Sequence, residues 1–206
     1  MKKLLVVLLL ICAASWAFAD TAQITTVSAP YGQAGPYKFN VQQSNPAYPS
    51  GNQWLVCWSD QNEISIGESW TANVYTIADV PVAGPFNQTT QSYTEIAWLA
   101  WQLVQHPGDI DLQVAIWQVA GLTGTTFQGQ FNQADVDQDI ADALAAIEGG
   151  YNASNALFYL PVNSDGQFIT DGPQPLVGFV PEPGSLFLLG TGILGAAGAI
   201  RRRFLI

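Results

Sequence analysis

Two polar side chains stand out in strongly apolar stretches: Cys57, which is the only cysteine outside the N-terminal leader, and the carboxamide of Gln113. Cys57 lies in Trp54-Leu55-Val56-Cys57-Trp58, and Gln113 lies in Leu112-Gln113-Val114-Ala115-Ile116-Trp117. A thiolate is a strong nucleophile, whereas a side-chain carboxamide is a poor electrophile. If the two groups are held in contact and donors polarise the carboxamide oxygen, attack by the sulfur can expel ammonia. The product is an internal acyl thioester, which survives only where water is kept out.

The same two residues also fit an ordinary core. In that interpretation Gln113 is a hydrogen-bonded polar residue on a buried helix, and Cys57 is a small buried hydrophobe. In the thioester interpretation, the indoles of Trp54, Trp58 and Trp117 shield the bond from water. An amine or hydroxyl group on a partner would then attack the Gln113 carbonyl and release Cys57. The residue types leave both interpretations open.

Cys57 and His106, the sole histidine, could instead form the reactive pair of a thiol hydrolase. His106 precedes Pro107 at a predicted helix end, where a solvated capping role fits it better. We therefore expect that the protein is not an enzyme.

Asp135, Asp137 and Asp139 have the spacing of a calcium-binding loop. Ile140 stands where such a loop needs glycine, however, and no glutamate occupies its last position. These acids are better explained as residues of a first helical turn, where the helix dipole favours negative charge. Neither a metal nor a cofactor is expected.

Hydrophobic periodicity predicts the elements that must position the reactive pair. Short apolar or alternating runs predict strands at residues 37–41, 54–59, 63–66, 68–77, 157–160 and 175–179. Residues 20–30 are polar and predict an extended leader. The order of strands, helices and strands favours an α+β domain, with a β-sandwich part and an associated helical part.

Three helices are predicted between the two groups of strands. The first begins at a capping box, Ser92 to Glu95, and stops at Pro107-Gly108. The second is capped by Asp109 and carries Gln113. The third extends from about residue 134 to residue 148, with Val136, Ile140, Leu144 and Ile147 as its apolar stripe.

Composition limits the class of protein. Residues 20–179 have the length of one domain, and Lys38 is their only basic residue, whereas all 16 acidic residues lie between Asp20 and Glu182. Such a domain cannot neutralise phosphates, so a nucleic-acid partner is excluded. A lone cysteine in an exported domain must find a partner, be reactive or be deeply buried.

Both ends of the chain predict export. Residues 1–19 have the basic start, apolar core and small-residue cleavage site of a secretory signal peptide. At the other end, Pro181-Glu182-Pro183 precedes an apolar segment, 184–200, that is long enough for a marginal membrane span. The cluster Arg201-Arg202-Arg203 follows it and would stop the span on the cytoplasmic side.

The order of these three C-terminal parts resembles the PEP-CTERM sorting signal of Gram-negative bacteria, here over residues 180–206. The resemblance implies a transient stay in the inner membrane and cleavage near Pro181-Glu182-Pro183 by an exosortase. The product would reach the cell surface or extracellular matrix. A plain tail anchor is the alternative, but it has no need of the Pro-Glu-Pro motif.

The region between the two signals resembles thioester domains, which are bacterial surface modules with an internal Cys–Gln bond. Gly35-Pro36-Tyr37 precedes the first strand, and Asp60 closely follows Cys57. Residues 112–117 resemble the family's Thr-Gln-x-Ala-Ile-Trp signature, with Leu112 in place of the threonine. The resemblance implies that Cys57 is the nucleophile and Gln113 the acyl donor of an adhesive domain. A structural matrix protein of the same fold without the bond is the alternative.

Overall fold

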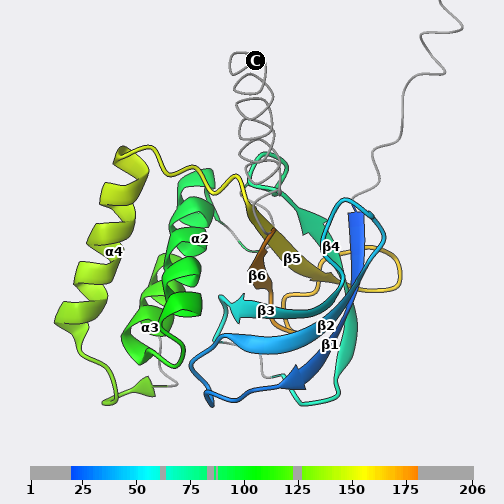
Figure 1. The fold of residues 1–206 in the computed structure, drawn as a ribbon, viewed down its shortest axis with the longest axis horizontal. Coiled ribbons are helices and arrows are strands. Elements are labelled where there is room, and N and C mark those ends of the chain that lie inside the picture. The colour runs from blue at the N-terminus through cyan, green and yellow to red at the C-terminus, as the bar shows by residue number, and fades with distance from the viewer. Residues whose placement is uncertain (1–19, 61–63, 83–85, 87, 123–126, 181–206) are drawn as a thin grey trace, which may run out of the picture.

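A computed structural model describes residues 20–60, 64–82, 86, 88–122 and 127–180. Within these ranges, antiparallel strands close into one barrel in the order β1-β2-β3-β6-β5-β4 (Figure 1). The strands are β1 (Asp20–Ser28), β2 (Tyr37–Gln43), β3 (Gly51–Cys57), β4 (Ser69–Tyr75), β5 (Ala156–Val162) and β6 (Leu176–Phe179).

Alternating burial explains why β1, β2 and β4 form strands. Ile24 on β1, Phe39 on β2 and Ala72 on β4 are fully buried, and residues on either side of them are more exposed. Strand β5 is different because every one of its residues is buried. Its Phe158 ring packs against Tyr93 of a helix, with ring centroids 4.9 Å apart. This strand is therefore covered on both faces.

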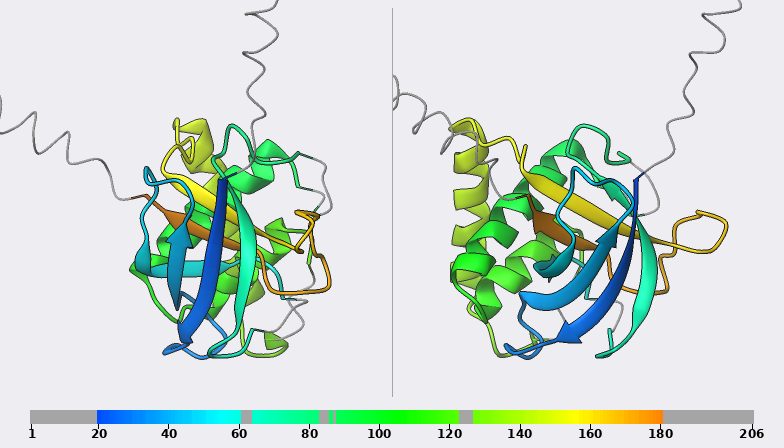
Figure 2. Two further views of the ribbon diagram at one scale, coloured as in Figure 1. Left: turned by 90° about the vertical axis from the view of Figure 1, so that its right-hand side faces the viewer. Right: turned by 45° about the vertical axis from the view of Figure 1, so that its right-hand side comes forward.

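Three helices lie together along one side of the barrel (Figures 1 and 2). They are α2 (Thr90–Gln105), α3 (Ile110–Val119) and α4 (Gln133–Glu148). Helix α2 packs against β3, β6 and both other helices. Ile96, Leu99 and Leu103 form its buried stripe, as their spacing predicts. Helix α2 thus joins the barrel to the helical part, and the α+β class is confirmed.

The expected β-sandwich part is wrong, because the strands form one closed barrel instead of two stacked sheets. Residues 20–28, expected to be a polar leader, form β1. This strand pairs with β2 on one side and with β4 on the other. Its buried positions are Ala22, Ile24 and Thr26, which are small or short enough that their period is weak in the sequence.

Two local predictions fail for reasons visible in the backbone. Residues 64–66 do not form a strand, because the Glu68 N–H bonds to the Ser65 carbonyl in a turn. Helix α2 begins before the expected capping box, since Thr89 is its N-cap and accepts a hydrogen bond from the Ser92 N–H. Glu95 does not complete a box and instead accepts a hydrogen bond from Gln91.

Other predictions are confirmed. Residues 157–160 and 175–179 lie in β5 and β6, which pair antiparallel. Asp109 caps α3, and Gly149 follows the last residue of α4. The stripe of α4 needs one correction: Leu144 is 37 % exposed, and Ala143 is buried in its place. The small alanine side chain lets α4 pack closely on the neighbouring helices.

The expected signal peptide, 1–19, lies outside the described residues, and so do Pro181, Glu182, Pro183 and Arg201 to Arg203. The apolar segment 184–200 also lies outside them. Among the helices of the described ranges, none is long and apolar enough to cross a membrane.

The three spaced aspartates do not form a calcium loop, because Asp135, Asp137 and Asp139 all lie within α4. In the described part of the chain, no group of histidine, cysteine and acidic side chains could hold a metal ion. Asp135 is in the first turn of the helix, as expected.

We predict that Asp139 makes folding stability depend on pH. Burial, followed by repulsion from Asp109 and other acids, raises its pKa from the ordinary 3.8 to about 6. The folded state therefore holds this proton more tightly than the unfolded chain. Stability falls as the pH rises from 3.8 to about 6, and the loss is complete above that range. Asp139→Asn should raise the melting temperature at pH 7.5 and have little effect near pH 4.

Asp165→Asn is the matched control, since Asp165 is exposed in a turn and loses the same charge. It should leave the melting temperature nearly unchanged at both pH values. Equal responses of the two variants at pH 7.5 would contradict the assignment to Asp139.

Candidate functional site

The structure brings Cys57 and Gln113 into contact. Cys57 is the last residue of β3 and is 1 % exposed, and Gln113 lies in α3 and is 0 % exposed. The Gln113 side-chain amide donates a hydrogen bond from Nε2 to the Cys57 carbonyl oxygen, at 2.9 Å. The nucleophile and the acyl donor expected from the sequence are thus direct neighbours in a dry interior.

Backbone contacts fix both elements at this junction. Cys57 pairs with Leu176 of β6, and the next N–H, of Trp58, bonds to the Pro175 carbonyl at 3.3 Å. The start of α3 is held from the other side, because the Gly108 N–H donates to the Gly35 carbonyl at 3.1 Å. The loop before β2, the end of β3 and the start of α3 therefore meet at one place.

Gly35 also supplies a donor to the Gln113 carboxamide. Its N–H bonds to Gln113 Oε1 at 3.1 Å within the buried site. A side chain at this position would be crowded, because a Cβ on Gly35 would lie 3.3 Å from both Gln113 Oε1 and the Tyr37 ring. A fixed backbone N–H on a carbonyl oxygen is the arrangement that stabilises developing negative charge during acyl transfer.

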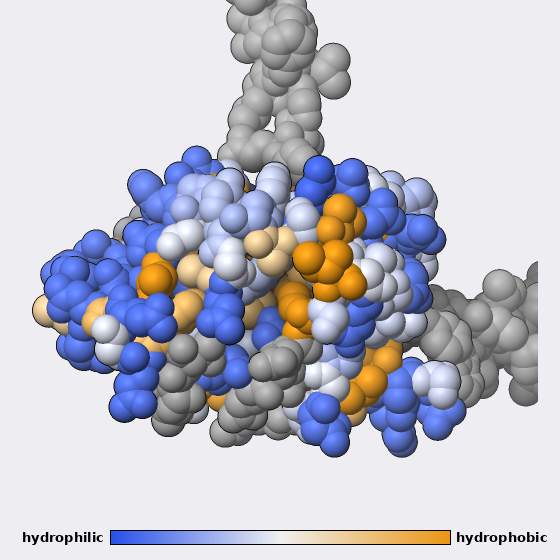
Figure 3. Space-filling view, turned by 90° about the horizontal axis from the view of Figure 1, so that it is seen from below, coloured by the Kyte–Doolittle hydropathy of each residue, from blue (hydrophilic) through white to orange (hydrophobic). Residues whose placement is uncertain are grey.

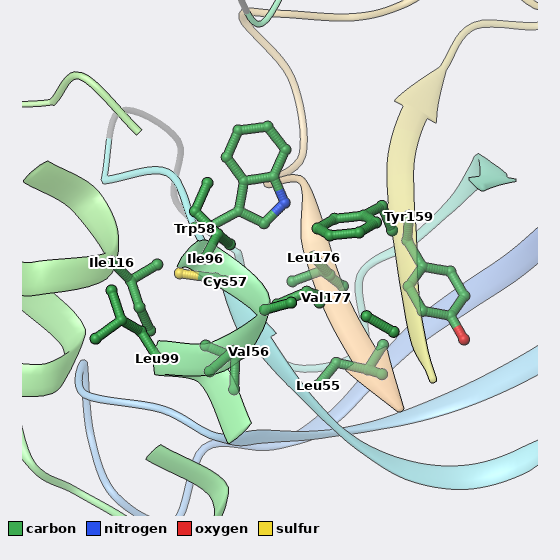
Figure 4. Close-up of a cluster of buried hydrophobic side chains, with 14 of the residues drawn as sticks. Leu55, Val56, Cys57, Trp58, Ile96, Leu99, Ile116, Tyr159, Leu176 and Val177 are labelled. Atoms are coloured by element: carbon green, nitrogen blue, oxygen red, sulfur yellow. The ribbon is translucent and has the colours of Figure 1, made fainter. Parts of the chain in front are cut away.

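The Cys57 thiol is buried and protonated at neutral pH. Its Sγ donates to the Ser59 carbonyl at 3.6 Å. Burial raises the pKa of Cys57 to about 12, although hydrogen bonds from Trp117 and from the Ser59 backbone lower it in part. The Trp117 contact is weak, since Nε1 lies outside ordinary hydrogen-bond geometry with any described residue. Figure 4 shows the sulfur pointing toward Ile116 and α3.

Two of the three expected shielding tryptophans are buried. Trp58 packs its indole against Phe86 and Tyr93, and Trp117 stacks on Phe127 with ring centroids 5.3 Å apart. Trp54 was expected to shield the site but is 42 % exposed. It precedes the inward-facing Leu55, so the two-residue period of a strand turns it outward.

A cavity of about 410 Å³ lies at the end of the barrel where β1 finishes, and that end is seen from below in Figure 3. In that view, hydrophobic surface is interspersed among hydrophilic side chains. The described residues that line the cavity include Thr26, Tyr37, Asp60, Trp117 and Gln174. Cys57 and Gln113 are not among them.

Three of the lining residues are coupled to the buried sulfur. Trp117 and Asp60 both act on the Cys57 thiol, the first lowering its pKa and the second raising it. Tyr37 is affected in turn, because burial and then Cys57 raise the pKa of its hydroxyl. The cavity therefore lies near Cys57, although neither Cys57 nor Gln113 lines it.

His106 does not form a reactive pair with Cys57. It is exposed at the C-cap of α2, where its Nδ1 lies 3.1 Å from the Gln102 carbonyl. The Cys57 thiol is buried and bonds to Ser59 instead. Among the described residues, no hydrogen bond joins the thiol to the imidazole, as a thiol hydrolase would need.

The sequence does not reveal the Gly35 donor or the contribution of Thr26 and Gln174 to the cavity. Gly35-Pro36-Tyr37 stands out only as a motif, because the role of a backbone N–H depends on where the loop is placed. Thr26 and Gln174 have no signal of their own, since they reach the cavity from β1 and from the loop before β6.

Comparison with known proteins identifies the C-terminal signal. Residues 179–203 match the PEP-CTERM protein-sorting motif, and this range includes every expected sorting residue from Pro181 to Arg203. The motif indicates exosortase-dependent export to the surface or exterior of a Gram-negative cell. No curated protein and no solved structure matches the chain.

We predict that Gln113 stabilises the domain even when no covalent bond can form. In a Cys57→Ala background, Gln113→Leu leaves the Gly35 N–H and the residue 57 carbonyl buried without their partner. Each unpaired group costs roughly 1–3 kcal/mol. The midpoint of urea unfolding should therefore fall markedly.

Gln118→Leu in the same background is the control, because Gln118 lies on the same helix and its side chain hydrogen-bonds to the exposed Gln133. Its effect should stay within about 0.5 kcal/mol. If both leucine variants unfold at the same urea concentration, Gln113 does not organise this junction.

Proposed function

We propose that the exported protein is a single-use covalent trap, in which an internal Cys57–Gln113 thioester captures a nucleophile on a surface or matrix molecule. The observation that carries this proposal is the placement of the Gln113 carboxamide between the Gly35 N–H and the Cys57 backbone carbonyl. The resemblance of residues 112–117 to the thioester-domain signature supports it. The sorting motif supplies the surface location that such a trap requires.

The bond forms by acyl transfer. Cys57 Sγ attacks the Gln113 side-chain carbonyl carbon, and a C–S bond forms while the C–N bond breaks. Ammonia leaves with the proton that the thiol loses. The Gly35 N–H stabilises the oxygen on which negative charge develops. Because both side chains are held in place, the reaction gains the advantage of proximity.

Capture reverses the roles of the sulfur and nitrogen. An amine or hydroxyl group attacks the same Gln113 carbon, the C–S bond breaks, and Cys57 regains a proton. The partner remains attached to Gln113 through an amide or ester. Since the acyl group is consumed, each molecule reacts once and no catalytic turnover follows. This behaviour suits adhesion and does not require enzyme activity.

Burial explains how the bond would persist before capture. Hydrolysis needs water at the Gln113 carbonyl, and both reacting side chains are almost completely inaccessible. The high pKa of Cys57, about 12, keeps a released sulfur protonated. Because the thiolate is the nucleophilic form, both the formation of the bond and the reversal of capture require the thiol to lose its proton.

Intact mass spectrometry of the exported protein tests the proposal. The protein should be lighter by one ammonia than its sequence requires, and methylamine should then add to it. Peptide mapping should place the methylamine on Gln113 and none on Gln118, which lies on the same helix. Cys57→Ala should abolish both the mass loss and the labelling.

An unmodified mass, with a thiol that can be alkylated after unfolding, would contradict the bond. The protein would then be a structural component of the surface or matrix with the same fold. Turnover of an ester or peptide that depends on Cys57 would favour a hydrolase instead.

A further inference from the structure

We propose that the cavity beside the reactive pair binds a primary alkylammonium group, with Asp60 as its counter-ion. The role of this cavity in capture rests on the proposed function, whereas its ligand class rests on the residues that line the cavity. In this assignment the Asp60 carboxylate selects an amine over a hydroxyl.

The chemistry of the lining points to a short cation with an apolar stem. Asp60 provides a carboxylate, and Tyr37 and Trp117 place aromatic rings, which attract cations, in the cavity wall. Ala29 and Ile64 add apolar surface suited to the methylene groups of the stem. The cavity volume of about 410 Å³ lies within the range of small-molecule sites.

One polar group in the cavity wall, the Thr26 hydroxyl, has no hydrogen-bond partner among the described residues. The Thr26 hydroxyl oxygen is buried, and no described residue hydrogen-bonds to it, although Thr26 is only 3 % exposed. Buried hydroxyls are normally satisfied. An ammonium group carries three donors, so it can bond to this oxygen as well as to the Asp60 carboxylate.

The charge of the domain favours the same ligand. Lys38 is the only basic residue between positions 20 and 180, so the surrounding field is strongly negative. A negative field attracts cations and raises their local concentration at a cleft. This field does not raise the local concentration of a neutral alcohol.

Asp60 lines the cavity three residues after Cys57, so its carboxylate can hold the ammonium group on this side of the cavity. An ammonium group must lose one proton to water before its nitrogen can attack. The nitrogen forms a bond to the Gln113 carbon as the C–S bond breaks. Of the two protons that the nitrogen loses in all, one ends on the Cys57 sulfur and the other passes to water.

Binding can be measured apart from reaction. In Cys57→Ala no thioester exists, so ligand-observed NMR with n-butylammonium chloride reports on the cavity alone. We expect n-butylammonium to bind more tightly than n-butanol at neutral pH. Adding Asp60→Asn should weaken n-butylammonium binding by about tenfold or more and leave n-butanol unchanged. Asp165→Asn, which removes an exposed charge elsewhere, should change neither.

Reaction rates separate recognition from bond formation. In the protein with Cys57 intact, Asp60→Asn should slow the addition of methylamine by roughly tenfold. Hydroxylamine, which is largely uncharged at neutral pH, should react within about twofold of the unsubstituted rate.

The outcomes distinguish the two proposals. A wild-type protein without the ammonia loss defeats the covalent trap, but the binding measurement still decides the alkylammonium site. Equal binding of n-butylammonium and n-butanol, or binding that does not depend on Asp60, overturns the site. Equal methylamine rates with and without Asp60 overturn its role in capture. If Asp60→Asn prevents the thioester from forming, the binding measurement alone decides the ligand class.

Discussion

The structure depends on one buried carboxamide that joins three parts of the chain. Gln113 Oε1 accepts from the Gly35 N–H, and its Nε2 donates to the Cys57 carbonyl. A polar side chain that is fully buried is tolerable only when its groups are paired, and here both sides of the amide have a partner. The same contacts hold Gln113 against the backbone of Cys57. In our proposal, the stability of this junction and the formation of the thioester therefore depend on the same contacts.

The barrel and the helices position different residues of the site. The pairing of β3 with β6 fixes the end of β3 and hence Cys57. Helix α3 brings Gln113, and α2 packs between the barrel and α3. The loop before β2 closes the junction through Gly35. No single element holds the site, so it exists only when the barrel and helices are assembled.

Much of the local structure could be predicted from the sequence, but the closure of the strands into a barrel could not. The period of Ile96, Leu99 and Leu103 predicts α2, and Asp109 marks the start of α3. The alternation of buried and exposed residues in β1 is weak in the sequence. The sequence therefore does not predict that β1 pairs with both β2 and β4, and without this pairing the closed barrel cannot be predicted. Among the site residues, Cys57 and Gln113 stand out as polar groups in apolar runs. The Gly35 donor does not stand out in the sequence, because its N–H reaches Gln113 Oε1 only when the loop is folded.

An experimental electron-density map of the exported protein, at a resolution that separates bonded from non-bonded atoms, tests the covalent trap most directly. Our account predicts continuous density between Cys57 Sγ and the Gln113 side-chain carbonyl carbon, at the length of a covalent bond. It also predicts that the Gln113 amide nitrogen is absent and that the Gly35 N–H still points at the carbonyl oxygen. An intact carboxamide, in van der Waals contact with a free thiol in freshly exported protein, would contradict the account.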